Sequence, residues 1–265
     1  MVEFEIDSKV SIDKNASMYF EEAKKSRKKA SGAEEAVSLA RKKLEAHESA
    51  RKENEEKKLA EVKREKKWFE KFRWFISSEG FLVIGGRDAT TNDIIVKKHL
   101  DKGDIAFHTD LAGSPFVIVK AGEKSEGKNT VQSPTIATLQ EAAEETSSFS
   151  RGWKMGISEM DVFYVEPGQV SVTARPGEYM GKGSFMIYGK RNNMRAKMRV
   201  AVGIYDGAVM CGPESAVKKN CEKALVVAQG GEKKTDVAKK IARALLCSLD
   251  DVVRELPSGG LRIVK

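Results

Sequence analysis

The residues best suited to binding chemistry gather between Arg175 and Arg199, in the sequence RPGEYMGKGSFMIYGKRNNMRAKMR. Seven Lys or Arg residues stand there against one acid, interleaved with three aromatic residues and four glycines. Cations attract phosphate whatever the base sequence, aromatic faces stack on unpaired bases, and glycine lets the backbone approach a ligand closely. The stretch therefore favours nucleic-acid contact. The alternative is a solvated hairpin whose aromatic residues belong to the core.

Charge is distributed unevenly along the chain. Residues 14–73 hold nineteen basic and twelve acidic residues, whereas residues 79–174 hold nine basic and fourteen acidic ones. Positive charge thus lies on an N-terminal appendage and on the later basic stretch, which favours a polyanionic partner such as RNA. The RNA-binding candidates in the basic stretch are Arg175, Lys182, Lys190, Arg191, Asn192 and Arg195.

A second candidate phosphate contact is IGGRDATTND, where Gly85-Gly86 separates a predicted strand from a predicted helix. Its spacing matches neither the dinucleotide fingerprint nor the P-loop. Backbone N–H groups at the start of the helix can still hold one RNA phosphate, with Arg87 as a clamp that Asp88 orients. The alternative is a plain helix cap with a surface ion pair. The same helix supplies three further RNA candidates: Asn92, Lys97 and Lys98.

His108 and Asp110 are two residues apart on the predicted strand DIAFHTD, so both point to one face. An imidazole beside a carboxylate can perform acid–base chemistry or bind a metal. With Asp88, this pair defines a nuclease-like or nucleotide-processing enzyme as an alternative function. The other histidines, His47 and His99, fall on the appendage and at a helix end, so we expect neither a metal site nor a catalytic residue. A pair that shapes a loop or touches RNA is the favoured interpretation.

The sequence SRGWKMG follows another predicted helix and adds Arg151 and Lys154 to the RNA candidates. Trp153, between them, has the flat ring that base stacking needs. A single Trp in such a position more often belongs to the core, and that is the alternative.

Length and composition set the broad class. The chain has 265 residues, a net charge of +8 and 40% hydrophobic residues, which suits one large domain with an appendage. No apolar run approaches the length of a membrane span, and the N-terminus is not a signal peptide. The three cysteines form no CxxC pair, so we expect reduced thiols in the cytoplasm, no zinc and no cofactor. Cys247 is expected to be a buried small hydrophobe.

Residues 1–67 are expected to form a helical appendage. From Lys14 onward the chain is strongly helical, and its sparse apolar residues follow one narrow seam with spacings of three and four. This pattern predicts a helical hairpin or short antiparallel coiled coil that turns at Ser31-Gly32 or between Glu48 and Asn54. A single helix laced by i,i+4 charge pairs is the alternative.

The globular part is expected to be α+β, with a mixed, mostly antiparallel sheet and flanking helices. The aromatic residues of WFEKFRWF mark its start, because such density is costly in water. ISSEGFLVIGG and VAVGIYDGAVMCG predict hairpins, the second turning at Asp206-Gly207. FVIVK is apolar enough for a central strand. DVFYV and QVSVTA are predicted to pair across Glu166-Pro167-Gly168, and helices are predicted from Ser133 and from Thr235 to Leu249.

Several long stretches in the same order resemble the NFACT family. They are WFEKFRWFISSEGFLVIGGRDATTNDIIVKKHL, GDIAFHTDLAGSPFVIVK, SFSRGWKMG and DVFYVEPGQVSVTARPGEYMGKGSFMIYGKRN. The part of the chain from about Trp68 to Asn193 resembles the family's RNA-binding (NFACT-R) domain. The preceding NASMYFEEAKKSRKKASGAEEAVSLARKKLEA is similar to the family's coiled-coil region. Where the family often has HAD, this chain has His108-Thr109-Asp110, which keeps the His/Asp pair.

The resemblance implies a part in ribosome-associated quality control. Full-length members carry a further N-terminal domain with an acidic–arginine motif tied to tRNA handling, and that motif is not carried over to this chain. We expect a split-gene product or a truncated form, working with a separately encoded N-terminal half. The expected domains are a coiled-coil appendage (1–67), an NFACT-R-like domain (68–200) and an α/β extension packed on it (201–265).

The first functional hypothesis is therefore a non-enzymatic RNA-binding module. It would bind tRNA or rRNA on an obstructed large ribosomal subunit, in the cytoplasm and without a membrane. The nuclease-like enzyme and a protein–protein adaptor acting through the coiled coil are the alternatives.

Overall fold

The computed structural model describes residues 5–60, 64–121, 133–173 and 185–264, with only the backbone for residues 46–60. The chain divides into two compact units, Met1–Glu65 and Lys66–Lys265. The first unit is built around one helix, and the second holds the sheets and the remaining helices. Each unit is considered by itself.

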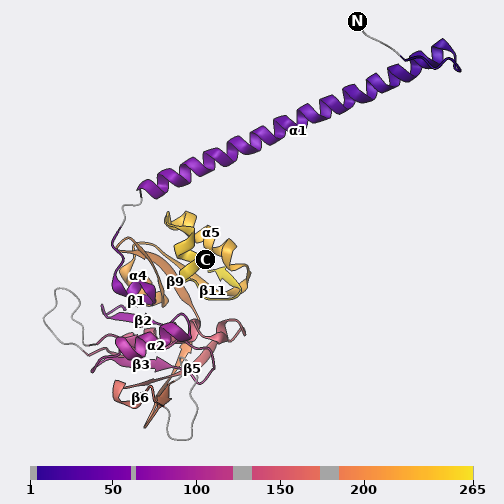
Figure 1. Ribbon diagram of the computed structural model, residues 1–265. Helices are drawn as coiled ribbons and strands as arrows, with labels where there is room; N and C mark the ends of the chain where they lie inside the picture. Colours follow the sequence, from indigo (N-terminus) through magenta and orange to yellow (C-terminus); the bar gives the residue numbers. More distant parts are fainter. Residues whose placement is uncertain (1–4, 61–63, 122–132, 174–184, 265) are drawn as a thin grey trace. The chain divides into compact units, whose positions relative to one another are not determined.

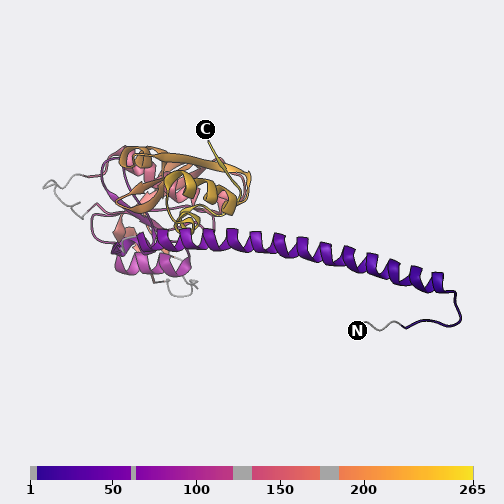
Figure 2. The same ribbon diagram turned by 90° about the horizontal axis from the view of Figure 1, so that it is seen from above.

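The first unit contains a continuous helix, α1 (Ile12–Ala60), and the predicted hairpin is wrong (Figures 1 and 2). The helix passes through Gly32 and through both segments where a turn was expected. Apolar side chains of the seam, such as Val37 and Leu44, are more than half exposed. A glycine inside a helix costs about 1 kcal/mol relative to alanine, which does not suffice to force a turn. Among the described residues, no helix is both long and apolar enough to cross a membrane.

Asn15 fastens the residues before α1 to its first turn. Its side-chain amide oxygen accepts the Asp7 N–H at 3.1 Å, and its side-chain nitrogen donates to the Asp7 carbonyl at 3.1 Å. One turn further along, the Tyr19 hydroxyl donates to the Glu5 carbonyl at 2.7 Å. Asn15 is consequently buried on an otherwise exposed helix.

The second unit confirms the α+β fold class. Its larger sheet has six strands in the order β1-β2-β4-β3-β5-β8, and every pair is antiparallel (Figure 1). The predicted hairpin between β1 and β2 is present, with Gly80 at φ 89° in its turn, and the predicted central strand FVIVK is β4. The strands are β1 (Arg73–Ile76), β2 (Leu82–Gly85), β4 (Val117–Val119), β3 (Ile105–His108), β5 (Glu159–Val165) and β8 (Asn192–Lys197).

A second antiparallel sheet follows in the chain, in the order β10-β9-β11-β12. The predicted hairpin at Asp206-Gly207 is confirmed, with φ values of 49° and 71° that suit a tight primed turn. These strands are β9 (Val200–Tyr205), β10 (Ala208–Gly212), β11 (Ala224–Glu232) and β12 (Leu261–Ile263).

The predicted pairing of DVFYV with QVSVTA is wrong. DVFYV belongs to β5, which lies between β3 and β8. Within QVSVTA, β6 (Val170–Ser171) pairs instead with β7 (Met186–Ile187). The Glu166-Pro167-Gly168 segment leads into a 3₁₀ turn, η3 (Pro167–Gln169), so the chain leaves the large sheet there and does not fold back on β5.

The helices differ from expectation mainly at their ends. Thr135, not Ser133, caps α3 (Ile136–Ser148), with its hydroxyl accepting the Ala137 N–H. The helix predicted from Thr235 to Leu249 ends four residues earlier, at Leu245, because Leu246 takes a left-handed conformation with φ 53°. A separate helix starts at Leu249. The remaining helices are α2 (Ala89–Lys98), α4 (Glu214–Asn220), α5 (Lys234–Leu245), α6 (Leu249–Glu255), η1 (Trp68–Lys71) and η2 (Arg151–Trp153).

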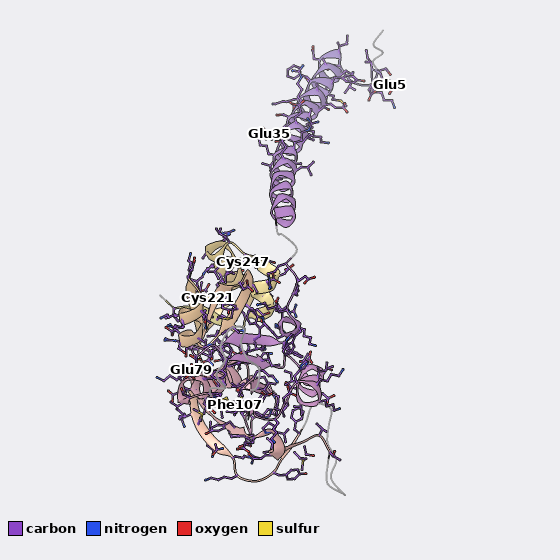
Figure 3. All side chains as sticks on the ribbon, turned by 90° about the vertical axis from the view of Figure 1, so that its left-hand side faces the viewer. Glu5, Glu35, Glu79, Phe107, Cys221 and Cys247 are labelled. Atoms are coloured by element: carbon purple, nitrogen blue, oxygen red, sulfur yellow. The ribbon has the colours of Figure 1, made fainter. Side chains whose placement is uncertain are left out.

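Two apolar clusters form the core of the second unit. The first contains Phe72, Phe75 and Phe107 from the large sheet, the last of them labelled in Figure 3. The second contains Ile241 and Leu256 from the C-terminal helices. The three cysteines are free: Cys211 and Cys221 are buried, whereas Cys247 is only half-buried, not fully buried as predicted.

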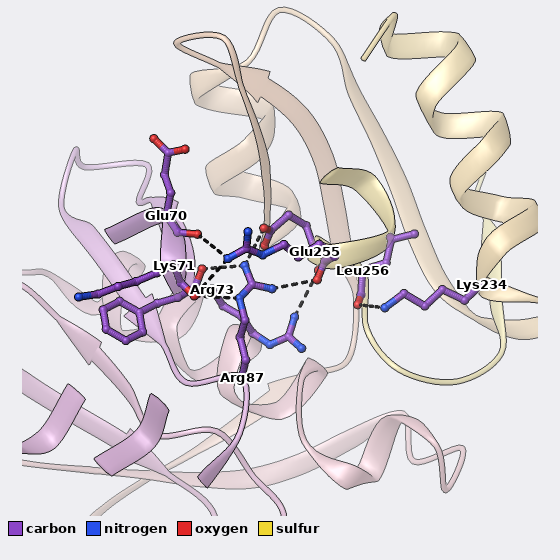
Figure 4. A network of polar contacts seen from close by, with 9 residues as sticks. Glu70, Lys71, Arg73, Arg87, Lys234, Glu255 and Leu256 are labelled. Carbon is purple, nitrogen blue, oxygen red and sulfur yellow. Dashed lines mark hydrogen bonds and ion pairs between the residues drawn. The ribbon is translucent and has the colours of Figure 1, made fainter. Parts of the chain in front are cut away.

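A buried charge network joins the β1–β2 region of the large sheet to the end of α6 (Figure 4). Arg87 Nη2 lies 2.6 Å from Glu255 Oε1 at the end of α6 and 2.7 Å from the carbonyl of Phe72. Arg73 donates to the Glu255 carbonyl at 3.4 Å and stacks over Phe149 at 4.0 Å. Burial raises the pKa of Glu255, while Arg87 acts in the opposite direction. The ion pair at 2.6 Å indicates the charged form.

Glu145 of α3 is the unusual member of this region. It is fully buried, and neither carboxyl oxygen has a hydrogen-bond partner among the described residues. Burial raises the pKa of Glu145 to about 8, and the charge of Arg73 only partly opposes this shift. The side chain is therefore mostly protonated at neutral pH, which avoids an unpaired buried carboxylate.

We expect Glu145→Gln to abolish part of the pH dependence of stability. Between the ordinary pKa of 4.5 and the folded value of about 8, the folded state binds more protons than the unfolded state. The free energy of unfolding therefore falls as pH rises, by up to about 1.4 kcal/mol per pH unit. Glutamine stays neutral, so the variant should gain stability over the wild type from pH 5 to pH 8.

Urea unfolding at the two pH values would measure this, followed by tryptophan fluorescence. Trp68, Trp74 and Trp153 all belong to the second unit, so the signal reports that unit alone. Glu222→Gln, at an exposed acid, is the control and should behave as the wild type. An unchanged pH slope in folded Glu145→Gln would contradict the assignment.

We also expect deletion of residues 1–65 to leave the second unit folded. Both apolar clusters and both sheets lie beyond the deleted residues. The urea midpoint of the truncated chain should match that of the full chain by tryptophan fluorescence. Loss of a cooperative transition would show that the unit depends on the helix.

Candidate nucleic-acid interface

A cleft of about 400 Å³ opens where three loops of the second unit meet. One loop runs from the end of β2 into α2, one follows β3, and one contains β7. Phe149, which follows α3, completes the wall. The cleft is lined by Gly86, Arg87, Asp88, Ala89, Asn92, His108, Ala112, Gly113, Ser114, Pro115, Phe149, Phe185 and Ile187.

The first loop is fixed by the start of α2. Asp88 is its N-cap, and its carboxylate accepts the Thr91 N–H at 2.8 Å. Asn92 Oδ1 accepts the Phe116 N–H at 3.0 Å. A Cβ at position 86 would lie 1.7 Å from that same oxygen, so the glycine is required there. Asn92 is buried and positions the loops, which differs from the predicted direct RNA contact.

Arg87 does not have the predicted arrangement, in which Asp88 orients its guanidinium toward a phosphate. Its guanidinium pairs with Glu255 and donates to the carbonyls of Lys71, Phe72 and Arg254. Through these bonds the Arg87 side chain connects the loop after β2 to η1 and α6. The side chain still forms part of the cleft wall, but its charge is already paired.

The second loop carries His108 and Asp110. The imidazole lies between the rings of Phe116 and Phe163, with centroids 6.2 and 6.1 Å away. Burial lowers the pKa of His108, while hydrogen bonding to the backbone of Thr109 and Ser114 acts in the opposite direction. Neutral imidazole is therefore the form present at physiological pH, and it can donate or accept a hydrogen bond.

Asp110 is exposed and pairs with Arg191. Arg191 Nη1 lies 2.7 Å from Asp110 Oδ1, and the guanidinium stacks over Phe163 at 4.5 Å. The structure thus brings His108, Asp110 and Arg191 together around one aromatic ring. The ring holds Arg191 flat, an orientation that suits contact with a phosphate or a base.

Gln169 anchors the third loop. Its side-chain nitrogen donates to the carbonyl of Tyr188 at 2.8 Å and to that of Lys190 at 2.9 Å. Gly189, between the two carbonyls, has φ 81°, a conformation that glycine tolerates. Lys190 and Asn192 are exposed on either side of Arg191. Arg175 and Lys182, also predicted to bind RNA, lie outside the described residues.

The remaining predicted cations divide between the cleft and other places. Arg151 is exposed and lies at the rim of the cleft. A Cβ added to Gly113, a residue of the cleft wall, would be 3.7 Å from the Cβ of Arg151. Lys154 instead lies beside Gly259 near β12. Arg195 is exposed on β8 and pairs with Glu159 at 3.2 Å and Asp161 at 3.6 Å. Trp153 is buried and donates to the Gly260 carbonyl, so it belongs to the core.

Lys97 and Lys98 lie at the other end of α2 from the cleft. Lys97 pairs with Asp93 at 2.9 Å, one turn back on the helix. Ten helical residues span about 15 Å, so these two lysines do not join the cleft. They belong to a different part of the surface.

Sequence reasoning missed two residues that build this interface, Phe163 and Gln169. The strand pairing that places Phe163 opposite His108 was not predicted. Gln169 precedes the basic stretch in the sequence, and no local pattern indicates that its side chain donates to the carbonyls of Tyr188 and Lys190. In the described part of the chain, no three His, Cys, Asp or Glu side chains gather as a metal site requires.

A family model described as the NFACT protein RNA binding domain matches residues 71–189, which include the first two loops and β7 of the third. The archaeal Rqc2 homolog aRqcH of Methanocaldococcus jannaschii is 38% identical over 212 residues, 77% of this chain and 30% of that protein. Ribosome quality control complex subunit NEMF of Homo sapiens is 39% identical over 184 residues, 67% of this chain and 16% of that protein.

The NEMF homolog of Drosophila melanogaster is 44% identical over 127 residues, 47% of this chain and 12% of that protein. The chain therefore spans less than a third of the length of these curated relatives. Taken together, the matched domain and the relatives show that this chain belongs to the NFACT family.

Proposed function

We propose that this chain is an RNA-binding module of a ribosome-associated quality-control factor. The observation that carries the proposal is a cleft lined by His108, Phe149 and Phe185, with Arg151 beside Gly113 of its wall and Arg191 stacked on Phe163 next to His108. Lys190 is exposed beside Arg191. Cations at the rim suit phosphates, and the rings and amides inside suit bases or sugars. Arg191 is preorganised by Phe163 and Asp110, which lowers the entropic cost of binding.

The relatives support the biological setting. Three of them are named as Rqc2 or NEMF proteins, and the matched domain is described as RNA binding. On this proposal the RNA is tRNA or rRNA on an obstructed large ribosomal subunit in the cytoplasm. A separately encoded N-terminal half of the kind that the family's longer members carry is proposed as a further partner.

The proposal is of a binding module and not of an enzyme. Asp88 is engaged as a helix cap, and Asp110 is paired with Arg191. His108 lies between two aromatic rings and belongs to the cleft wall. These roles account for the three residues of the nuclease-like alternative without a catalytic step.

We expect the triple change Arg151→Ala, Lys190→Ala and Arg191→Ala to weaken RNA binding and flatten its salt dependence. Each phosphate contact removed should lower the steepness of log K against log salt by roughly 0.7 to 0.9. All three side chains are exposed, so the fold should survive with changes of a few tenths of a kcal/mol. Affinity for tRNA, measured at several salt concentrations, tests this.

The matched control removes three cations from α5, with Lys239→Ala, Lys240→Ala and Arg243→Ala. These residues are also exposed and carry the same total charge. If both triple variants lose the same salt dependence, the effect is one of net charge. An unchanged slope in the folded cleft variant would mean that RNA binds elsewhere.

We expect His108→Ala to reduce RNA affinity by less than about tenfold, the loss of about one hydrogen bond. Incubation of labelled RNA with the wild type, with and without added divalent cations, should leave the RNA intact. Cleavage by the wild type that His108→Ala abolishes would support the enzyme instead. The variant's fold is checked by its urea midpoint.

A further inference from the structure

A second aromatic surface lies at the end of α2 that faces away from the cleft. Trp68 of η1 stacks on His99, with ring centroids 4.6 Å apart and an angle of 16° between the planes. Trp68 is 42% exposed, although it is the first residue of a segment whose other aromatic side chains are buried. One face of the indole is therefore supported by the protein, and much of the ring remains accessible.

The supporting ring is held rigidly. Phe72 contacts His99 edge to face at 5.3 Å, and the His99 carbonyl accepts a bond from Lys120 at 2.9 Å. Burial lowers the pKa of His99, with Lys71, Lys120 and Lys98 adding to the effect. The imidazole is consequently neutral, and it offers Trp68 a flat aromatic support without a charge.

Two cations flank this aromatic pair without an acidic partner among the described residues. Lys71 follows Trp68 on η1, and its amine lies 4.9 Å over the Phe72 ring. Lys98 is exposed immediately before His99. The neighbouring acids are already engaged, since Asp101 and Asp104 both pair with Lys120, at 2.6 and 2.7 Å. The Glu70 carboxylate accepts the backbone N–H of Lys67 at 2.8 Å.

We infer that Trp68 stacks an unpaired base of a bound RNA, with Lys71 and Lys98 contacting the adjoining phosphates. This inference rests on the proposed function and specifies the substrate as single-stranded. A flat neutral ring beside cations disfavours a cationic ligand and suits an anionic chain that carries planar groups. Bases within a duplex already stack on their neighbours, so only an unpaired base can lie on the indole.

The position of the surface is consistent with one strand crossing α2. The helix begins at the cleft with Asp88 and ends at Lys98 beside His99, a distance of about 15 Å. A strand that follows the helix would reach both the cleft and Trp68. Lys97 and Lys98, which do not join the cleft, then have a phosphate-binding role on the same path.

Fluorescence of the full chain tests the inference directly. Trp74 and Trp153 are 4% and 3% exposed, so Trp68 alone offers a face on which a base can stack. An oligoadenylate of about twelve nucleotides, a length typical of single-strand sites, should quench the fluorescence, and a blunt RNA duplex of equal length should not. Trp68→Leu should abolish quenching and weaken oligoadenylate binding by about 5- to 150-fold, the range for one lost stack.

Trp68→Phe keeps a smaller aromatic face and should retain part of the affinity, which separates stacking from a general effect on the fold. Leu249→Ala, at another partly exposed apolar residue of the same unit, should bind as the wild type. The double change Lys71→Ala and Lys98→Ala should lower the salt slope by about 1.4, at roughly 0.7 per contact for single strands.

The outcomes distinguish this inference from the proposed function. If the wild type binds RNA with a steep salt dependence but Trp68→Leu binds oligoadenylate equally well, only the inference is overturned. Equal quenching by the duplex, or by a polyglutamate peptide, overturns it too, because the surface would then recognise anions and not bases. If no RNA binds the wild type with salt-dependent affinity, the proposed function itself fails.

Discussion

The ion pair between Arg87 and Glu255 is the interaction on which the second unit depends most. It joins the residue after β2 to the end of α6, and both side chains are largely buried. Removing one partner of such a pair leaves an uncompensated buried charge, at a cost of about 3–5 kcal/mol. Arg73 and Lys234 bind backbone carbonyls next to it, at Glu255 and Leu256. The matched domain ends at residue 189, yet the acid that pairs with its Arg87 lies in α6, beyond that boundary.

This connection also explains how the cleft keeps its shape. The Arg87 side chain ties the loop after β2 to Glu255. Asp88 and Asn92 tie the same loop to α2 and to the backbone of Phe116. The cleft is consequently built from loops whose backbones are tied to the interior. Its exposed cations, Lys190 and Arg151, need only side-chain rotation to meet a ligand.

Local signals made some elements predictable from sequence, and distant contacts made others unpredictable. Asp206-Gly207 and Gly80 mark their turns through backbone conformation alone. The α+β class and the helix after Gly86 followed from patterning and residue type. The partner strand of DVFYV could not be predicted in this way. The true partner, β8, comes about thirty residues later, and the entropy of closing that loop is only slightly more unfavourable than for the nearer segment QVSVTA. Arg87 was predicted to face phosphate because its acidic partner lies 168 positions away in the sequence. The hairpin was preferred to the single helix α1 because a sparse line of apolar residues suits one helix as well as two.

Gln169 has a consequence that concerns chemical ageing. Its side-chain nitrogen donates to the carbonyls of Tyr188 and Lys190, and its side-chain oxygen accepts the Glu166 N–H at 3.0 Å. Deamidation would turn this amide into a carboxylate, which has no N–H to donate and would repel both carbonyls. The loop that carries Lys190 and Arg191 would lose its anchor and gain a negative charge beside its cations. A single spontaneous reaction at a residue outside the basic stretch would thus weaken the electrostatic surface that the stretch presents.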